Sequence, residues 1–167
     1  MTASQFLVVA LDGRDRAGFS CSSDPLNRYF HAQASQDMRR RVASCYIAVD
    51  QTTDVIAGYY TLSAADIPLT ELPPDLTKRL PRYPTLPAAR LGRLAVDHRY
   101  LGQKLGALLL ADAVMRASAS DVAVYAMVVD AKDANAEAFY RHHGFVNYAS
   151  VLGKLMAPLG RLLGQQA

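Results

Sequence analysis

The segment from Leu91 to Ala113 changes its apolar period once, from the pattern of a strand to that of a helix. Leu91–Val96 is a short apolar stretch, and from Leu105 onward leucine and alanine recur at the spacing of one helix face. Gly102 and Gly106 lie at this junction. A strand, a glycine-containing turn and a helix N-terminus bring free backbone N–H groups and the positive end of the helix dipole together, so this unit can bind an anion. Taken alone the signal is weak, because two glycines before a helix are common.

The remaining sequence alternates between strand and helix patterns. The strand patterns are Phe6–Leu11, Tyr46–Val49, Val55–Leu62, Val122–Val129, Phe145–Tyr148 and Val151–Met156. A further helix covers Asp133–His142, and Gly144 supplies its stop. The second and third strands predict a hairpin across the polar residues 50–54, and the continuous run Val122–Val129 predicts a strand buried on both faces. The order predicts a mixed α/β domain around one central sheet.

One long helix is expected after Asp24-Pro25, with Asp24 as its N-cap and Pro25 in the first helical position. Its buried face is predicted from an apolar repeat of four residues: Leu26, Phe30, Ala34 and Met38. Arg39, Arg40 and Arg41 close this helix. They can stabilise the negative end of the helix dipole or contact phosphates, and the sequence favours neither.

Six prolines fall between residues 66 and 90. They exclude a long helix or a central strand there, because proline lacks the N–H that both structures need. A loop of this length inside a compact domain is usually functional, so we expect this segment to contribute to a site.

Length and composition predict one domain over residues 1–160 and a flexible tail over residues 161–167. The chain has 167 residues, of which 51% are hydrophobic, and no apolar run long enough to span a membrane. No secretory signal is expected, which predicts a cytoplasmic protein. Cys21 and Cys45 are expected to be buried free thiols rather than a disulfide, and no metal site is predicted.

The net charge of +3 is unevenly distributed. Residues 78–104 contain seven basic side chains and one acid, Asp97, which gives 7 − 1 = +6. The other residues carry 11 − 14 = −3. This asymmetry indicates an anionic partner, and the alternative is a solvated loop with scattered charges.

The second segment that can support chemistry is Asp133–Phe145, in which Tyr140 lies near the end of the predicted helix. A phenol with a reference pKa near 10 can donate a proton to a departing thiolate at neutral pH. A lone tyrosine on a helix is usually a packing residue, so Tyr140 gains weight only from its pairing with the strand–turn–helix unit.

Both segments together resemble the GNAT N-acetyltransferases over nearly the whole chain. The pyrophosphate turn of that family is matched by Gly102, Leu105 and Gly106, and its later tyrosine motif by Ala136, Phe139, Tyr140 and Gly144-Phe145. The resemblance implies a GNAT fold, with a central mixed, mostly antiparallel sheet flanked by helices, acetyl-CoA as cofactor, and Tyr140 as catalytic acid. The implied cofactor-binding residues are Leu94, Ala95, Val96, Leu101, Gly102, Gln103, Lys104, Leu105, Gly106, Asp133, Ala136 and Phe139.

Other segments resemble more narrowly the acetyltransferase toxins of bacterial toxin–antitoxin modules. These segments are Tyr29–Val42, Gly58–Ser63, Leu80–Pro84 and Leu91–Asp97. The resemblance implies acetylation of the α-amino group of aminoacyl-tRNA, which stops translation. It also implies a homodimer, a ribbon-helix-helix antitoxin, and contact with operator DNA only through the antitoxin complex.

Three positions depart from the family pattern. Leu101 replaces a glutamine or arginine, Lys104 replaces the central glycine of the turn, and Asp133 replaces an asparagine. A positive φ at Lys104 would cost energy that glycine avoids, although an ammonium there can meet a phosphate.

Arg93, beside the predicted catalytic strand, is the first candidate for binding the acceptor end of tRNA. The alternative for Arg93 is an ion pair with Asp97 or Asp133. The second candidates are two basic groups: Arg39, Arg40 and Arg41, and Lys78, Arg79 and Arg82.

The predicted mechanism is direct attack of a neutral amine on the thioester, with backbone N–H groups near Ala95 and Val96 stabilising the carbonyl oxygen. Two alternatives stay open at this level. One is acetylation of a small amine or a protein amino terminus, and the other is a non-catalytic co-repressor that binds an antitoxin.

Overall fold

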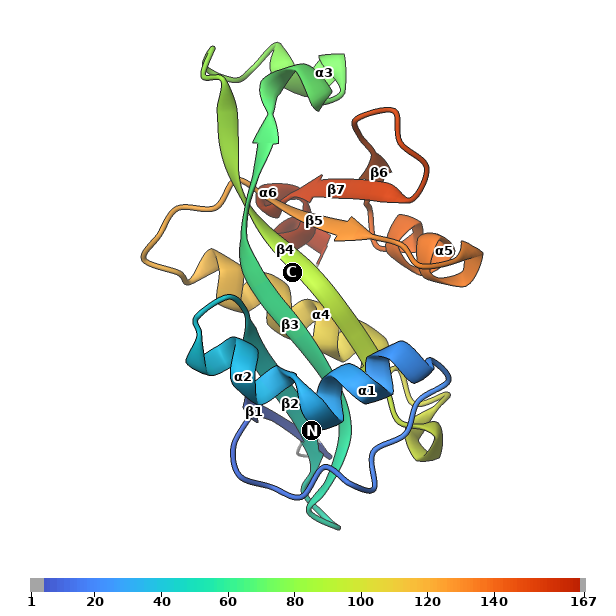
Figure 1. Cartoon of the computed structure of the whole chain (residues 1–167). Coiled ribbons are helices and arrows are strands. Elements are labelled where there is room, and N and C mark those ends of the chain that lie inside the picture. Colours follow the sequence, from blue (N-terminus) through green and yellow to red (C-terminus); the bar gives the residue numbers. More distant parts are fainter. Residues whose placement is uncertain (1–4, 166–167) are drawn as a thin grey trace. The chain divides into compact units, whose positions relative to one another are not determined.

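The computed structural model describes residues 5–165 (Figure 1). The strands are β1 (Phe6–Ala10), β2 (Ser44–Asp50), β3 (Val55–Pro68), β4 (Thr85–Val96), β5 (Ala126–Asp130), β6 (Val146–Asn147) and β7 (Lys154–Pro158). The α-helices are α1 (Asp24–Ala32), α2 (Ala34–Arg39), α3 (Pro74–Thr77), α4 (Leu105–Ser118), α5 (Ala134–His142) and α6 (Leu159–Gln165). Two single turns of 3-10 helix are η1 (Leu69–Glu71) and η2 (His98–Tyr100).

The described strands form one sheet in the order β1-β2-β3-β4-β5-β7-β6. The β1–β2, β2–β3, β5–β7 and β6–β7 pairs are antiparallel, whereas β4 and β5 are parallel. A parallel pair needs a crossover, and α4 supplies it. The mixed, mostly antiparallel sheet with flanking helices confirms the predicted fold class.

Backbone contacts divide the chain into two compact units. The first unit comprises residues 5–63 and Gly92–Ala113, and the second comprises Ala64–Leu91 and residues 114–165. The expectation of a single domain over residues 1–160 remains a prediction, and each unit is described by itself below.

Alternating side chains of β3 build two apolar layers in the first unit. Tyr59 stacks on Phe30 of α1, with ring centroids 4.3 Å apart, and belongs to the cluster between the strands and α1–α2. Its neighbour Tyr60 points to the opposite face and donates a hydrogen bond to Asp112 of α4. Successive side chains of a strand alternate between faces, so β3 packs against helices on both sides (Figure 1).

The second unit packs β5 and β7 against the loops and short helices around them. Its core contains Ile67, Leu86, Val128 and Met156, all 5% exposed or less. The parallel register between β4 and β5 joins Ala88–Arg90 to residues 126–128, and β4 continues for six more residues, Leu91–Val96.

The helix expected from Asp24 to Arg41 is two helices, α1 and α2, separated by Gln33. Gln33 leaves helical geometry with φ −125° and ψ −26°, and its N–H closes α1 on Tyr29 O. The N-cap is also different from the prediction: Ser23 accepts a hydrogen bond from Leu26 N, and Asp24 is the first helical residue. The apolar repeat is preserved because Phe30 and Ala34 are fully buried on either side of the break.

The proline-rich segment contains more strand than expected. β3 extends to Pro68 and β4 begins at Thr85, not at Leu91. Pro87 fits into β4 because a strand needs only its carbonyl at this position, and that oxygen accepts a hydrogen bond from Tyr125 N at 2.9 Å. Only residues 69–84 lie outside the two strands, and they hold η1 and α3.

The ends of two further elements also differ from the prediction. β5 begins at Ala126, and Val122 is 75% exposed, so the apolar run from residue 122 is not all strand. Where a flexible tail over residues 161–167 was expected, α6 reaches Gln165 and Leu162 is buried, whereas residues 166–167 lie outside the described part.

Two other expectations can be compared with residues 5–165. Cys21 and Cys45 are free and buried, as predicted. Within this range no helix has the length and apolar character needed to cross a bilayer, and no three potential metal ligands lie together.

Candidate active site

The end of β4 is held tightly against β3 in the first unit. Asp97 N donates to Ala57 O at 2.8 Å, and a Cβ added to Gly58 would lie 2.9 Å from Ala95 O. Such a contact is closer than any real Cβ makes, so glycine is required at position 58. The backbone of Leu94–Val96 is therefore fixed on its β3 side.

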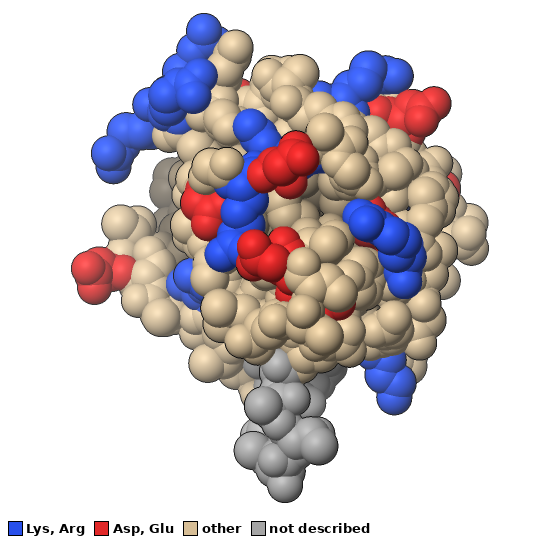
Figure 2. Space-filling view, turned by 90° about the horizontal axis from the view of Figure 1, so that it is seen from below, with Lys and Arg blue, Asp and Glu red and all other residues tan. Residues whose placement is uncertain are grey.

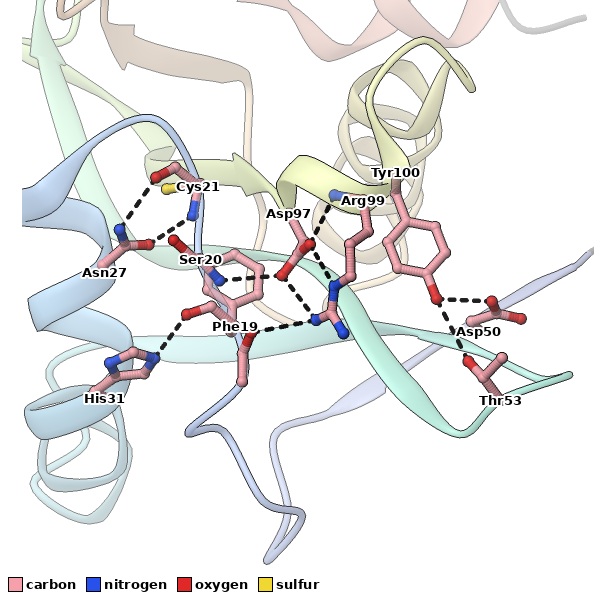
Figure 3. Close-up of polar contacts among 11 residues, drawn as sticks. Phe19, Ser20, Cys21, Asn27, His31, Asp50, Thr53, Asp97, Arg99 and Tyr100 are labelled. Atoms are coloured by element: carbon pink, nitrogen blue, oxygen red, sulfur yellow. Dashed lines mark hydrogen bonds and ion pairs between the residues drawn. The ribbon is translucent and has the colours of Figure 1, made fainter.

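Asp97, directly after β4, is the anchor of the connection to α4 (Figure 3). Its buried carboxylate accepts hydrogen bonds from Ser20 N at 3.0 Å and from Arg99 N at 2.8 Å. The guanidinium of Arg99 donates two further bonds, from Nε to Oδ1 at 2.8 Å and from Nη2 to Oδ2 at 2.9 Å. Burial raises the pKa of Asp97, but the bonds from Arg99 and Ser20 outweigh it and hold the pKa below its ordinary value.

Tyr100 fixes the next residue of the same connection. Its hydroxyl donates to Asp50 Oδ2 at 2.7 Å, and Thr53 Oγ1 lies 3.4 Å from the hydroxyl (Figure 3). Asp50 also accepts from Thr52 N at 3.0 Å, which ties the β2–β3 turn to the same point. Asp97 and Tyr100 therefore hold η2 in place from two sides and fix where the following turn begins.

The turn between η2 and α4 contains two residues with positive φ. Gly102 has φ 80° and Lys104 has φ 60°. Leu101, Gly102, Gln103 and Lys104 are all exposed, and α4 begins at Leu105, which is buried. An exposed turn that leads into a 14-residue helix leaves N–H groups for an anion, with the Lys104 ammonium on the same turn.

Tyr140 lies near the end of α5 in the second unit. Its ring is 7% exposed and packs edge-on against Phe139 at 5.2 Å and at a tilt against Phe145 at 5.4 Å. Burial raises the pKa of Tyr140, so the phenol is protonated at neutral pH. Gly144 ends this segment with φ 97°, as the sequence predicted.

Asp133 is the N-cap of α5. Its Oδ1 accepts a hydrogen bond from Ala136 N at 2.8 Å. Asparagine and aspartate cap helices equally well, so this departure from the family pattern leaves the helix that carries Tyr140 intact.

Arg93 contacts an aromatic ring in the first unit and is not paired with Asp97 there. Asp97 is paired with Arg99, and Asp133 caps α5. The guanidinium of Arg93 instead lies over the ring of Tyr29 in α1, with Cζ 3.5 Å from the ring centroid. This contact with Tyr29 was not predicted from the sequence.

The other basic candidates are exposed and fall in both units. Arg39, Arg40 and Arg41 lie at the end of α2 in the first unit, and Lys78, Arg79 and Arg82 lie between α3 and β4 in the second. The face in Figure 2 shows places where basic and acidic side chains lie next to one another, and also basic groups with no acidic neighbour. Pairs such as Arg14 with Asp12 and Asp54 explain such neutralisation.

The predicted site residues are thus divided between the units. The first unit holds Arg93, the cofactor candidates Leu94–Val96 and Leu101–Gly106, and the arginines of α2. The second holds Asp133, Ala136, Phe139 and Tyr140, together with Lys78, Arg79 and Arg82. The Asp97–Arg99 pair was not predicted, because residue spacing offered Arg93 and not Arg99 as the partner of Asp97.

Comparison with protein families gives a match to part of the chain. Residues 79–152 match the family model described as an acetyltransferase (GNAT) domain, a stretch that includes the end of β4, the turn, α4 and α5. The fold and this match agree with the sequence motifs that predict a GNAT-type acetyltransferase.

Two proteins described as toxins are similar to most of the chain. A tRNA-acetylating toxin of Mycobacterium tuberculosis is 28% identical over 80% of each chain, and the probable toxin TacT of Sinorhizobium fredii is 22% identical over 89% of this chain and 87% of its own.

Solved structures agree with these relatives. A tyrosine-to-phenylalanine variant of KacT has a TM-score of 0.88 at 26% identity and covers 97% of this chain and 99% of its own. AtaT complexed with acetyl-methionyl-tRNA has a TM-score of 0.87 at 27% identity, with the same coverage.

Proposed function

We propose that this chain is a toxin that transfers the acetyl group of acetyl-CoA to the α-amino group of aminoacyl-tRNA and so blocks translation. The observation that carries the proposal is the similarity of 97% of the chain, at a TM-score of 0.87, to AtaT complexed with acetyl-methionyl-tRNA. A tRNA-acetylating toxin is also among the relatives in sequence. Both chemistry-bearing segments of the chain fit this reaction.

Residues of the first unit would bind acetyl-CoA, whose thioester supplies the acetyl group. A structure of AtaTR bound with AcCoA, 27% identical to this chain, supports this choice of donor. Leu94, Ala95 and Val96 would offer strand backbone to the pantetheine arm, because β4 extends beyond its register with β5. Leu101–Gly106 and the first turn of α4 would receive the pyrophosphate, with the Lys104 ammonium beside it.

Tyr140 would act as the proton donor. The amine nitrogen forms a bond to the acetyl carbon and releases one proton to solvent, the carbon–sulfur bond breaks, and the phenolic proton moves to the departing sulfur. The phenolate of Tyr140 then regains a proton from solvent. The raised pKa keeps Tyr140 protonated before transfer. An α-amino group has a reference pKa of about 7.7–8.0, so a substantial share is neutral at pH 7 and no strong general base is needed.

The acceptor would be bound by basic side chains. Arg93 is the first candidate, because Asp97 and Asp133 are engaged elsewhere. The exposed groups Arg39–Arg41 and Lys78–Arg82 would follow the RNA backbone. A site for a cationic polyamine should be acidic, and residues 78–104 carry +6, which counts against a small polyamine as acceptor.

We further propose a homodimer in the cytoplasm, inhibited by a ribbon-helix-helix antitoxin that also carries the toxin to operator DNA. Two related structures support the antitoxin and the DNA as partners of such toxins. One is an AtaT variant bound to the C-terminus of the antitoxin AtaR, 25% identical to this chain, and the other is an AtaT–AtaR complex bound to DNA, 27% identical.

The test is transfer of label from radiolabelled acetyl-CoA to a pool of charged tRNA. The wild-type chain is expected to label the aminoacyl-tRNA, and Tyr140→Phe is expected to lower kcat by about 100-fold or more, because general-acid catalysis contributes that much. Acetyl-CoA affinity should stay within about threefold in this variant, since the ring and its packing are retained.

The matched control is Tyr125→Phe, which removes a hydroxyl from the second unit outside α5 and should leave turnover unchanged. An unchanged kcat in Tyr140→Phe would refute its role as the acid. Binding of acetyl-CoA without label on RNA would point to another amine. If the chain neither binds acetyl-CoA nor transfers label to RNA, the result would favour the non-catalytic co-repressor. The positive φ of Lys104 is the observation that supports this alternative.

A further inference from the structure

Arg93 of β4 is seated on the ring of Tyr29 of α1. The guanidinium Cζ lies 3.5 Å from the ring centroid, a distance at which the two planar groups are in direct contact. Tyr29 is 7% exposed, whereas Arg93 is half-buried. The cation therefore lies between a buried aromatic surface and solvent.

The ring under Arg93 is held in place from two further sides. The hydroxyl of Tyr29 donates to Asp37 Oδ2 of α2 at 2.9 Å. The ring also stacks on Tyr59, with centroids 6.4 Å apart and an interplanar angle of 19°. Tyr59 in turn donates to Leu26 O at 2.7 Å, so the support for Tyr29 is itself fixed. Tyr29 is a rigid platform and not a mobile surface side chain.

Stacking leaves the hydrogen-bonding capacity of Arg93 available. A guanidinium that lies flat on a ring keeps its N–H donors in its own plane, where they can form a fork with phosphate or carboxylate oxygens. Among residues 5–165, the two carboxylates considered as its partners are used by Arg99 and by the cap of α5. Burial, followed by the bond to Asp37, raises the pKa of Tyr29, so the ring is a neutral phenol at physiological pH.

We propose that Tyr29, held by Asp37, is a positioning residue that fixes Arg93 as a phosphate-binding group for the acceptor strand of aminoacyl-tRNA. This inference rests on the proposed function. It assigns the junction of α1 and α2 a specific task, because α1 supplies the platform and α2 supplies the carboxylate that orients it.

Tyr29 and Arg93 are expected to act together in binding RNA and to leave the binding of acetyl-CoA unchanged. Tyr29→Leu should raise the KM for aminoacyl-tRNA by about tenfold, the value of a partly desolvated cation–π contact. Tyr29→Phe keeps the ring and loses the bond to Asp37, so about a threefold rise is expected. The KM for acetyl-CoA should be unchanged in both variants, and kcat should change less than KM.

The experiment is a double-mutant cycle between Tyr29→Leu and Arg93→Gln, read out by KM and by binding of uncharged tRNA over a range of salt concentrations. Each single variant should reduce the steepness of the salt dependence by about one phosphate contact, and the double variant by no more than one. Asp37→Asn, which still accepts the tyrosine hydrogen bond, should rescue binding where Asp37→Ala does not. If Tyr29→Leu fails to fold, Tyr29→Phe takes its place in the double-mutant cycle.

The outcomes separate this inference from the proposed function. If Tyr29→Leu weakens tRNA binding by the same factor with and without Arg93, the two act independently and the positioning role is overturned. If the wild-type chain transfers no label to aminoacyl-tRNA, the proposed function fails. The coupling in uncharged tRNA binding then still decides whether Tyr29 positions Arg93.

Discussion

Lys104 occupies a backbone position that glycine would adopt without strain. Its φ of 60° lies in the left-handed region, which costs a residue with a Cβ about 1–2 kcal/mol. The sequence has lysine where the resembled family has glycine, and the structure gives this lysine the positive φ that glycine adopts freely. Such strain persists only where neighbouring structure enforces it, and Asp97 and Tyr100 do so here.

The variant Lys104→Gly should therefore distinguish the effect of backbone strain on stability from the effect of the ammonium charge on acetyl-CoA binding. The free energy of unfolding is expected to rise by about 1 kcal/mol, as measured by urea denaturation, because the strain is removed. Acetyl-CoA should bind about threefold more weakly at low salt, since the ammonium no longer meets a phosphate. Titration calorimetry at low and high salt measures the second effect, and the deficit should vanish at high salt. Tighter binding of acetyl-CoA by Lys104→Gly would contradict a phosphate contact.

At the scale of elements, the connection from β4 to α4 depends on a buried carboxylate. Asp97 receives hydrogen bonds from the loop before α1 and from η2, and Tyr100 bonds to Asp50 at the end of β2. These bonds reach across 77 and 50 residues of sequence, so they join the first strand–helix region to the turn. The turn Leu101–Lys104 is in this way held in place by elements that carry no recognisable motif.

Asp97 predicts a specific pH dependence of stability. Its folded-state pKa is below the unfolded value near 3.9, so the unfolded chain binds more protons between these two values. Its contribution is complete above about pH 5 and is lost as pH falls through the folded-state pKa. Asp97→Asn should lower the free energy of unfolding by about 2–3 kcal/mol at pH 7, because charged hydrogen bonds are removed.

Chemical denaturation at pH 7 and near pH 3 measures this difference. The difference in the free energy of unfolding between wild type and Asp97→Asn should be smaller at the lower pH. Asp121→Asn, at an exposed carboxylate, is the control and should show almost no gap at either pH. A gap that is constant with pH would mean that Asp97 contributes through shape and not through charge.

At the scale of the whole molecule, the positive charge is concentrated in one segment of the sequence. A net charge of +3 conceals +6 in residues 78–104. Part of this positive charge is paired with carboxylates of the same chain, since Arg99 binds Asp97 and Arg90 binds Asp130 at 2.7 Å. Lys78, Arg79 and Arg82 are exposed, and none of them lies in the turn proposed for acetyl-CoA, so they are the cations of this segment that we propose for RNA.

Replacing Lys78, Arg79 and Arg82 with glutamine should flatten the salt dependence of tRNA binding. Each phosphate that is no longer neutralised by a cation is expected to reduce the slope of log affinity against log salt by about 0.7–0.9, so the triple variant should show a slope smaller by about two units. Filter binding between about 50 and 200 mM salt measures the slope. Arg161→Gln, an exposed cation in α6, is the control and should leave it unchanged. An unaltered slope in the triple variant would place the RNA elsewhere.

Sequence determined the features that depend on a few neighbouring residues. The strand–turn–helix unit around Gly102, the helix that ends at Gly144 and the antiparallel hairpin of β2 and β3 follow from apolar period, glycine and turn chemistry, which act locally. For the same reason the two motifs were enough to predict an acetyltransferase.

Tertiary structure alone decided which distant side chains meet. The break at Gln33, the continuation of β3 and β4 into the proline-rich segment, the Asp97–Arg99 pair and the seat of Arg93 on Tyr29 all depend on packing between segments far apart in the chain. A hydrogen bond between Ser20 and Asp97 leaves no trace in residue spacing, because its partners become neighbours only after the sheet has formed.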